Sequence, residues 1–280
     1  MNILILGHKG MLGHDLMRQL SMGHDVTGKD IDDIDITSLS DCIHVVSDAN
    51  PDCVINAAAF TNVDACEIEQ EKSFAVNALG VKNIAEACRE KNIRIVHFST
   101  DYVFDGTKNK PYVEEDACNP INYYGYAKRE GEIYLRTISN NYLLIRTSWL
   151  YGIHGRNFVQ TIMEKGKTEK KLDVVDDQIG SPTYTKDLSA AVQLLIEGNH
   201  AGIFHCTNRG NCSWYDFAVK IIQTAQITDA AINPMKTDKL ARPAMRPLYS
   251  VLSNRKLSDA TGKIMRPWQI ALADYIDNVR

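Results

Sequence analysis

Residues 2–13 read NILILGHKGMLG, an apolar β-rich run that meets three glycines at the start of a helix-period segment. A strand that is covered on both faces in a parallel sheet is apolar almost throughout. Glycines allow the backbone to turn tightly and let another group approach it closely. We therefore expect a strand at residues 2–6, a tight turn, and a helix at residues 12–20.

The alternation of apolar runs and helix-period segments continues through the first half of the chain. Further strands are expected at residues 25–28, 53–57, 94–98 and 142–147. Helices are expected at residues 38–50, 69–91 and 124–137. Near-continuous apolar strands separated by helices predict an α/β fold, a Rossmann-like doubly wound parallel sheet with right-handed crossovers. We assign residues 1–150 to this dinucleotide-binding domain.

The pattern loosens into shorter elements after residue 150. A strand is expected at residues 172–175, and helices are expected at residues 158–167, 186–197, 213–226 and 267–279. The proline-bearing segment 235–248 is a candidate loop or lid. We expect residues 151–280 to form a smaller substrate-binding lobe, part of which returns to the main sheet.

The composition is that of an ordinary globular protein and argues against several classes of function. The chain has 280 residues, 44% of them hydrophobic, which is enough to bury a sizeable core. Its net charge of −4, from 31 Lys+Arg and 35 Asp+Glu, supplies no positive field for nucleic acid. The apolar run before Gly7 is too short for a signal peptide or a membrane span, so we expect a cytoplasmic protein without a membrane partner.

The cysteines and histidines do not follow the spacing of a metal site. The 7 cysteines are scattered, with no C-x-x-C pair, which predicts reduced thiols rather than a disulfide framework. The 8 histidines include no H-x-H or H-x-x-x-H arrangement. We therefore expect no bound metal.

The glycine turn has the spacing G-x-x-G-x-x-G at positions 7, 10 and 13. Between a strand and a helix, such a turn offers backbone N–H groups and a positive helix end to a pyrophosphate. Asp30, at the end of the second strand, is placed to accept hydrogen bonds from the ribose hydroxyls of NADH. Lys9 and Lys29 lie close enough in sequence to neutralise the 2′-phosphate of NADPH, so both cofactors stay open. Asp30 is alternatively one of several acidic residues in a loop.

Tyr124 and Lys128 lie four residues apart on a predicted helix and so share one face. Tyrosine has an ordinary pKa near 10 and is a poor acid or base at neutral pH. An adjacent cation lowers that pKa by favouring the phenolate. Tyr123 and Tyr126 are rival tyrosines, but neither has a lysine one helical turn later. The alternative for the pair is a solvated helix face.

The segment STDYVFDG, residues 99–106, directly follows the strand expected at residues 94–98. Thr100 is therefore placed at the carboxyl end of a parallel sheet, where ligands of such sheets bind. An ordinary Ser/Thr/Asp turn is the alternative.

The glycine loop, STDYVFDG and Y-x-x-x-K, in this order and spacing, resemble the extended short-chain dehydrogenase/reductase superfamily. Within it they most resemble the dTDP-4-dehydrorhamnose reductase family, and the resemblance covers essentially the whole chain. Further segments that carry it are Asn56-Ala57-Ala58-Ala59, Thr61, Val63 and Asp64; residues 76–80 and 146–152; Asn157-Phe158; residues 177–183; and Arg242-Pro243.

The resemblance implies a role for each matching residue. Thr100, Tyr124 and Lys128 become the catalytic hydroxyl, the general acid and the partner that lowers its pKa. Asn77 would hold the helix that supports the site. The implied cofactor residues are Gly7, Gly10, Met11, Leu12, Gly13, Asp30, Asp35, Ile36, Ala57, Ala58, Ala59, Tyr124 and Lys128. The implied substrate residues are Thr100, Asp101, Trp149, Asn157 and Arg242.

Trp149 follows the strand expected at residues 142–147, which should end at the same sheet edge as Thr100. A flat apolar ring there suits the C–H face of a sugar. Arg242 and Arg246, in the proline-bearing segment, are the nearest cations for a pyrophosphate. The alternative is that Trp149 is a core residue and that the two arginines are surface charges.

The residues after Thr100 distinguish reductases from 4,6-dehydratases among the families that this chain resembles. A 4,6-dehydratase needs a glutamate where this chain has Tyr102, so the resemblance implies reduction of a ketone. The expected reaction is NAD(P)H-dependent conversion of dTDP-4-dehydro-L-rhamnose to dTDP-L-rhamnose, a step of polysaccharide biosynthesis. Alternatives are a reductase or epimerase of another nucleotide sugar, or a non-catalytic regulatory subunit that resembles the beta subunit of methionine adenosyltransferase. A homodimer stays open as the assembly.

Overall fold

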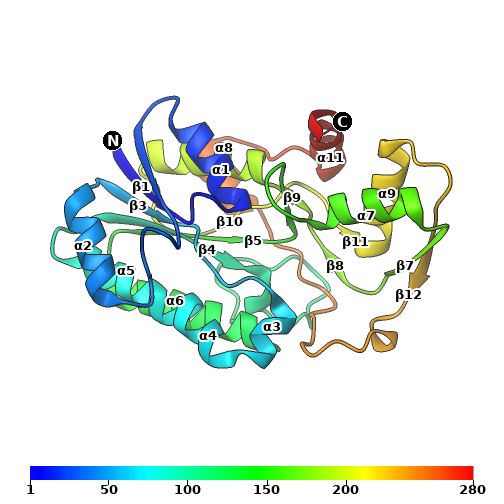
Figure 1. Ribbon diagram of the computed structural model, residues 1–280, viewed down its shortest axis with the longest axis horizontal. Helices are drawn as coiled ribbons and strands as arrows, with labels where there is room; N and C mark the ends of the chain where they lie inside the picture. The colour runs from blue at the N-terminus through cyan, green and yellow to red at the C-terminus, as the bar shows by residue number, and fades with distance from the viewer. Residues whose placement is uncertain (280) are drawn as a thin grey trace.

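The computed structural model describes residues 1–279 and contains the predicted α/β architecture (Figure 1). Within these residues, a six-stranded parallel sheet has the order β10-β5-β4-β3-β1-β2. Its strands are β1 (Asn2–Leu6), β2 (Asp25–Lys29), β3 (Cys53–Asn56), β4 (Arg94–Thr100), β5 (Tyr142–Thr147) and β10 (Gly202–His205). β3 and β4 are buried along their whole length, and in β4 this includes the polar residues Arg94, His97, Ser99 and Thr100.

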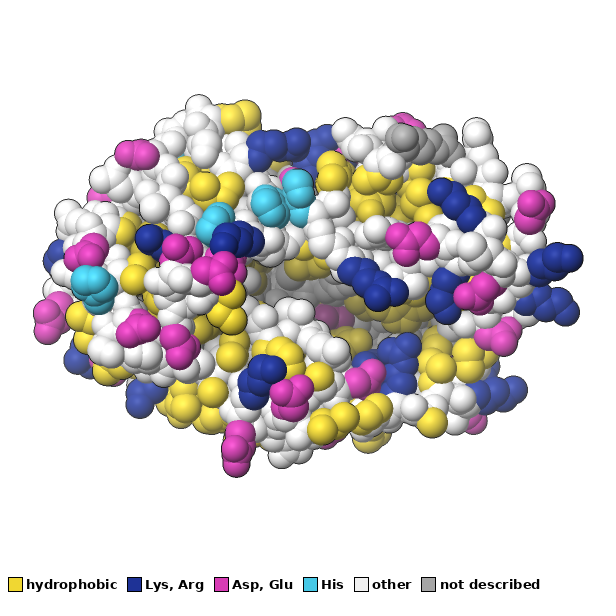
Figure 2. All heavy atoms as spheres, viewed as in Figure 1, with side chains coloured by type: hydrophobic (Ala, Val, Ile, Leu, Met, Phe, Trp, Pro, Cys, Tyr) yellow, Lys and Arg dark blue, Asp and Glu magenta, His cyan; other side chains and the backbone are white. Residues whose placement is uncertain are grey.

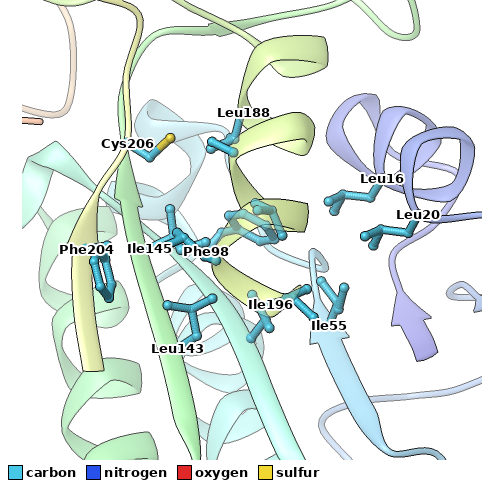
Figure 3. Packing of buried hydrophobic residues seen from close by; sticks show 14 of the residues in the cluster. Leu16, Leu20, Ile55, Phe98, Leu143, Ile145, Leu188, Ile196, Phe204 and Cys206 are labelled. Atoms are coloured by element: carbon cyan, nitrogen blue, oxygen red, sulfur yellow. The ribbon is translucent and has the colours of Figure 1, made fainter. Parts of the chain in front are cut away.

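Helices cover both faces of this sheet (Figure 1). One face carries α1 (Met11–Leu20), α8 (Thr185–Glu197) and α10 (Arg255–Thr261), and the other carries α2 (Leu39–Ala49), α5 (Gly80–Arg89) and α6 (Tyr123–Ile138). Leu16 of α1 and Leu188 of α8 point toward Phe98 and Ile145 on the strands, which closes the first of these layers (Figure 3). The doubly wound parallel sheet is confirmed.

A second lobe lies beside the carboxyl ends of the strands (Figure 1). It contains α7 (Phe158–Thr168), α9 (Trp214–Ala225), α11 (Trp268–Val279) and the parallel pair β7 (Lys171–Val175) and β12 (Ala231–Met235). Two short pairs complete it: β6 (Leu150–Tyr151) with β9 (Thr183–Tyr184), and β8 (Ile179–Gly180) with β11 (Cys212–Ser213). These elements surround their own apolar cluster, whereas β10, α8 and α10 pack with the main sheet.

The strands and helices expected from the pattern are present, most of them within two residues of the predicted bounds. The long helix expected at residues 69–91 is divided into α4 (Gln70–Phe74), a π-helical turn η1 (Ala75–Leu79) and α5. The pattern did not predict α3 (Val63–Ile68), α10, β10 or β12. These elements are short, and β12 contains a proline, so their periodicity is weak. Segment 235–248 is mainly loop, with a short turn η3 (Thr237–Lys239).

All seven cysteines carry free thiols, as expected. A search of the helices within residues 1–279 finds none with the length and apolar character needed to cross a bilayer.

Gly131 allows α6 to approach η1 closely, which leads to a prediction on stability. Replacing a glycine inside a helix by alanine usually stabilises a protein by about 1 kcal/mol. At Gly131 the new methyl group would overlap the backbone carbonyl oxygen of Asn77. Overpacking of this kind costs about 1–3 kcal/mol, so Gly131→Ala should lower the free energy of unfolding measured in urea.

Gly23→Ala is the control for this substitution. Among the described residues, the nearest atom to its new methyl group is a carboxylate oxygen of Glu197 at 3.9 Å, an ordinary contact. Its free energy of unfolding should stay close to that of the wild type. A more stable Gly131→Ala protein would show that α6 and η1 can separate without cost.

Candidate active site

The residues expected at the site follow strands that end at the same edge of the sheet. The glycine turn follows β1, and Ala57 to Ala59 follow β3. Thr100 ends β4 and pairs in register with Thr147 at the end of β5, which confirms that these two strands end together. The chain leaves β1 for β2 on one side and returns to β3 on the other. This is the switch point at which open α/β sheets bind their ligands.

The glycine turn is shaped by close contact with the segment after β3. Gly7 has a φ of +81°, and a methyl group added to it would lie 2.7 Å from the backbone nitrogen of Ala58. Gly10 is the N-cap of α1 and has no side chain to cap the helix. The first N–H groups of α1, together with the helix dipole, are therefore available to an anion.

A cavity of about 300 Å³ opens beside this turn. Its lining includes the expected cofactor residues Gly7, Gly10, Asp30, Asp35, Ile36, Ala57, Ala58 and Ala59. Leu12 and Gly13 are buried where α1 packs, and Met11 lies against Gly152. The structure thus brings together most of the implied cofactor residues, and the roles of the others stay predictions.

Asp30 closes the loop at the rim of this cavity. Its Oδ2 accepts a hydrogen bond from the Lys9 backbone N–H at 2.8 Å, and its Oδ1 accepts one from Ile31 at 2.9 Å. The Lys9 ammonium pairs with Asp32 at 2.6 Å. Lys9 is therefore engaged by a neighbouring carboxylate where the sequence left it free to meet a 2′-phosphate.

Tyr124 lies in the first turn of α6, and its position is set by the start of that helix. Asn122 caps α6 by accepting a hydrogen bond from Gly125 N–H at 2.8 Å, and it donates to the carbonyl of Met245 at 2.7 Å. The Tyr124 phenol lies close enough to the Thr100 hydroxyl for that hydroxyl to act on its pKa. The ring of Tyr102 meets that of Tyr124 edge-on, with centroids 6.2 Å apart. The predicted pair of Thr100 and Tyr124 therefore lies close together.

Burial shifts the pKa values of both Tyr124 and Lys128. Burial raises the pKa of the Tyr124 phenol well above its ordinary value, and the nearby Asp101 acts in the same direction. Burial lowers the pKa of the Lys128 ammonium to about 8. The Lys128 Nζ lies against His97, 3.3 Å from its Nε2, and the role of Lys128 in lowering the pKa of Tyr124 stays a prediction.

An ion pair that is fully enclosed by protein lies beneath this cluster. The Glu132 carboxylate, one turn after Lys128 on α6, accepts hydrogen bonds from the Arg146 Nε at 2.9 Å and Nη2 at 2.7 Å. It also accepts one from the Ser99 hydroxyl at 2.6 Å. These bonds join α6 to β5 and β4. Sequence patterns did not reveal this pair, because its partners lie fourteen positions apart on different elements.

Asn77 lies in the π-helical turn η1, a type of distortion that is frequent at functional sites. Its amide oxygen accepts from the Phe60 N–H at 3.0 Å, and its amide nitrogen donates to the Phe60 carbonyl at 2.9 Å. These two hydrogen bonds hold the backbone of Phe60, which directly follows Ala59. Asn77 thus fastens the cavity wall to the helix layer.

A larger cavity of about 580 Å³ lies between the two lobes, where the molecular surface is hollowed (Figure 2). Tyr102 lines it from the first lobe, and Phe158 and Trp214 line it from the second. Four cationic side chains also line it: Lys165, Lys171, Arg242 and Arg246. The sequence singled out the two arginines but neither lysine, because an exposed lysine on a helix or strand carries no distinguishing signal.

Arg246 and Arg242 differ in their surroundings. Arg246 is largely buried and pairs with Asp64 of α3 at 2.5 Å, whereas Arg242 is exposed. The carboxyl of Asp64 keeps a pKa below its ordinary value because Arg246 is its hydrogen-bonded partner. Arg246 therefore anchors segment 235–248 to the first lobe, and Arg242 remains free to meet a ligand.

Trp149 makes packing contacts of the kind that the sequence left open as an alternative, and Asn157 has a capping role that the sequence did not predict. The Trp149 ring stacks on Trp214 with centroids 3.5 Å apart and packs against Gly180, so it joins the apolar cluster of the second lobe. Asn157 caps α7: its amide oxygen accepts from Gln160 N–H at 3.0 Å, and its amide nitrogen donates to the Gly152 carbonyl at 2.9 Å. Neither side chain lines the larger cavity, and their roles in substrate binding stay predictions.

Asp101 is buried beside Thr100, and burial raises the pKa of its carboxyl to about 7. Its Oδ1 accepts a hydrogen bond from the Thr100 hydroxyl at 3.0 Å.

Across residues 1–279, no group of three or more His, Cys, Asp or Glu side chains is arranged to hold a metal ion.

Comparison with known proteins gives matches along the whole chain. Residues 1–280 match the protein family described as the RmlD substrate binding domain. The spore coat polysaccharide biosynthesis protein SpsK of Bacillus subtilis is 41% identical over 275 residues, which cover 98% of this chain and 96% of that protein.

The solved structures similar to this one include two dTDP-4-dehydrorhamnose reductases. The dTDP-4-dehydrorhamnose reductase of Clostridium acetobutylicum is 43% identical with a TM-score of 0.96, and the match covers 100% of this chain and 99% of that chain. The dTDP-4-dehydrorhamnose reductase of Bacillus anthracis, solved in complex with NADP, is 36% identical with a TM-score of 0.96 and 99% coverage of both chains.

The enclosed Glu132–Arg146 pair leads to a prediction on stability. Glu132→Gln keeps the shape of the side chain but leaves the Arg146 guanidinium buried without a counter-charge. Removing one partner of a buried pair costs about 3–5 kcal/mol, so the free energy of unfolding in urea should fall by this order. Glu86→Gln, which breaks the exposed pair of Glu86 and Arg89, should cost less than about 1 kcal/mol. Equal effects of the two substitutions would contradict the importance of the buried pair.

Proposed function

We infer the function from one premise: the chain belongs to the RmlD substrate binding domain family. It is an NAD(P)H-dependent reductase that reduces the C4 ketone of a nucleotide-activated 6-deoxy sugar, and we propose dTDP-4-dehydro-L-rhamnose as the substrate and dTDP-L-rhamnose as the product. The observation that carries this function is the placement of Tyr124 close to Thr100 and edge-on to Tyr102, which lines the larger cavity.

The residues around the smaller cavity fit a dinucleotide. A methyl group on Gly7 would fill the space in which the turn meets Ala58, and the first turn of α1 is uncapped. We propose that this turn holds the pyrophosphate and that Asp30 accepts hydrogen bonds from the adenosine ribose. Tyr124 and Lys128 would hold the nicotinamide ribose. When bound, the cofactor supplies the hydride that reduces the ketone.

Tyr124 is proposed as the general acid. Reduction of a ketone places negative charge on its oxygen, and a positioned donor stabilises that charge. Because burial raises the pKa of Tyr124, the phenol keeps its proton at neutral pH until a stronger base, the alkoxide, forms beside it. The Thr100 hydroxyl, close to the phenol, orients the carbonyl oxygen.

The larger cavity fits a sugar nucleotide because it combines aromatic walls with cations. We propose that Arg242, Lys165 and Lys171 attract the pyrophosphate, while Phe158 and Trp214 offer apolar surface to the rest of the ligand. In this proposal, residues 1–150 bind the cofactor, and residues 151–280 bind most of the substrate.

We further propose that the protein works in the cytoplasm, since a chain with seven free thiols suits a reducing compartment. A homodimer stays a prediction, and light scattering on the purified protein tests it.

Tyr124→Phe tests the proposed acid. The substitution should lower turnover with dTDP-4-dehydro-L-rhamnose by about 10²–10⁴-fold, followed at 340 nm, because it removes the proposed proton donor. Binding of NADPH, measured by its fluorescence, should stay within about twofold of the wild type. Tyr126→Phe is the matched control, since Tyr126 is exposed on the same helix and should keep nearly full activity. Retained turnover in Tyr124→Phe would contradict the assignment.

Asp30→Ala tests the choice of cofactor. The carboxylate should hydrogen-bond the free ribose of NADH and repel the phosphate of NADPH. We therefore expect the affinity for NADH to fall more than that for NADPH, measured by titration of each reduced cofactor. Asp32→Ala is the control, because it removes a nearby carboxylate but releases Lys9 from its ion pair. It should leave NADH binding unchanged and improve NADPH binding. An equal loss of both affinities in Asp30→Ala would mark Asp30 as a loop residue only.

A further inference from the structure

Thr100 and Asp101 form a buried pair at the end of β4, where they are 6% and 3% exposed. The Thr100 Oγ1 accepts a hydrogen bond from the Tyr102 backbone N–H at 3.1 Å. The same oxygen lies 3.0 Å from the Asp101 Oδ1. The second carboxyl oxygen of Asp101, Oδ2, is buried and has no partner within hydrogen-bond distance among the described residues. Asp101 is thus joined directly to the hydroxyl that is proposed to orient the ketone.

The hydrogen-bonding capacity of Thr100 limits what this pair can do. A hydroxyl has one proton to donate and two lone pairs with which to accept. The Tyr102 N–H occupies one of these lone pairs. An ionised Asp101 can only accept, so it would take the Thr100 proton and leave Thr100 with one free lone pair. A protonated Asp101 can donate to that lone pair instead, and the Thr100 proton is then free to bind another acceptor.

The two arrangements differ in what they offer to a ketone. With its proton free, the Thr100 hydroxyl donates to the ketone oxygen beside Tyr124. With that proton held by Asp101, the free lone pair of Thr100 repels the ketone oxygen and competes with it for the phenolic proton. We propose that Asp101 is a positioning residue whose protonated carboxyl donates to Thr100 and thereby makes Thr100 a hydrogen-bond donor to the ketone.

The surroundings of Asp101 favour the protonated carboxyl. Burial costs a carboxylate more than a carboxylic acid, and an oxygen without a partner adds to that cost. Burial raises the pKa of the Asp101 carboxyl to about 7, and the nearby Ser250 and Thr100 hydroxyls oppose this rise only in part. The guanidinium of Arg246, close to the next residue in the chain, is paired with Asp64 instead.

The other ionisable groups around the pair leave this arrangement in place. Tyr102, the next residue in the chain, and Tyr124, on α6, are neutral at physiological pH, because burial raises the pKa of each phenol. Lys128, also on α6, has a pKa of about 8, the value nearest to that of Asp101 in this cluster. Losses of activity near pH 7 and near pH 8 would therefore have different origins, Asp101 and Lys128.

The catalytic meaning of this arrangement rests on the proposed function, in which Thr100 orients a ketone. Asp101 does not line the larger cavity, so it acts on the reaction through Thr100 rather than by contact with the substrate. Its expected signature is a rate of reduction that falls as the pH rises through about 7, with little change in substrate binding.

The protonation of Asp101 is the first test, and it needs no substrate. Infrared difference spectra between about pH 6 and about pH 9 report neutral carboxylic acids by their C=O stretch, and ¹³C labelling of aspartate shifts the bands that belong to aspartate. We expect one such band, which disappears with a midpoint near pH 7 and is absent from Asp101→Asn. Asp105→Asn is the matched control and should keep the band, because hydrogen bonds, foremost that of the Thr107 N–H, lower the pKa of Asp105 to about 2. A wild-type protein without the band would overturn the proposal.

The pH dependence of the chemical step is the second test. Single-turnover reduction of dTDP-4-dehydro-L-rhamnose, followed at 340 nm with NADPH already bound, separates this step from product release. In the wild type, the rate constant should fall about tenfold between about pH 6 and about pH 8, as the ionised fraction of Asp101 rises. In Asp101→Asn, the amide donates to Thr100 at every pH, so the fall should be at most about twofold, the share that Lys128 would add. An equal fall in both proteins would overturn the proposal.

Thr100→Val shows whether Asp101 acts through Thr100. In that background, Asp101→Asn should leave the pH dependence of the slow remaining rate unchanged, because there is no hydroxyl to orient. A pH dependence that still changes would mean that Asp101 acts directly on the ligand and would overturn the proposal. If Asp101→Asn does not fold, the infrared band of the wild type decides. That band is measured without the keto-sugar, so a protein with the band but no turnover would refute the proposed function alone.

Discussion

The buried ion pair between Glu132 and Arg146 is the interaction on which the site depends. Burial of two charges is costly unless their hydrogen-bonding groups are satisfied. Here the Glu132 carboxylate is satisfied by Arg146 and Ser99, and the guanidinium lies over the ring of Phe104 at 5.2 Å. Lys128 and Tyr124 stand one and two turns before Glu132 on α6. The ion pair therefore fixes the position of α6 along the sheet and its rotation about its own axis, and so it positions Lys128 and Tyr124 relative to the ends of the strands.

Burial of the face of α6 that packs on the sheet also shifts the pKa values of its side chains. Burial raises the pKa of Tyr124, which keeps the phenol neutral, and lowers the pKa of Lys128 to about 8. A neutral phenol suits the reduction of a ketone, in which the protein must give a proton.

Contacts between segment 235–248 and the first lobe lie beside the larger cavity, close to the start of α6. Arg246 pairs with Asp64 of α3, and the carbonyl of Met245 accepts a hydrogen bond from Asn122, the cap of α6. Segment 235–248 is thus held at the start of the helix that carries Tyr124.

The sequence by itself determined the parallel sheet, the glycine turn and the pairing of Tyr124 with Lys128 on one helix face. These features are local: they follow from the apolar character of each strand, from backbone freedom at glycine and from helical spacing. Only the tertiary structure decided that Trp149 stacks on Trp214, that Asn157 caps α7, and that Lys128 faces His97. Contacts between residues far apart in the chain, and the loss of water that shifts a pKa, arise only when separate elements pack together.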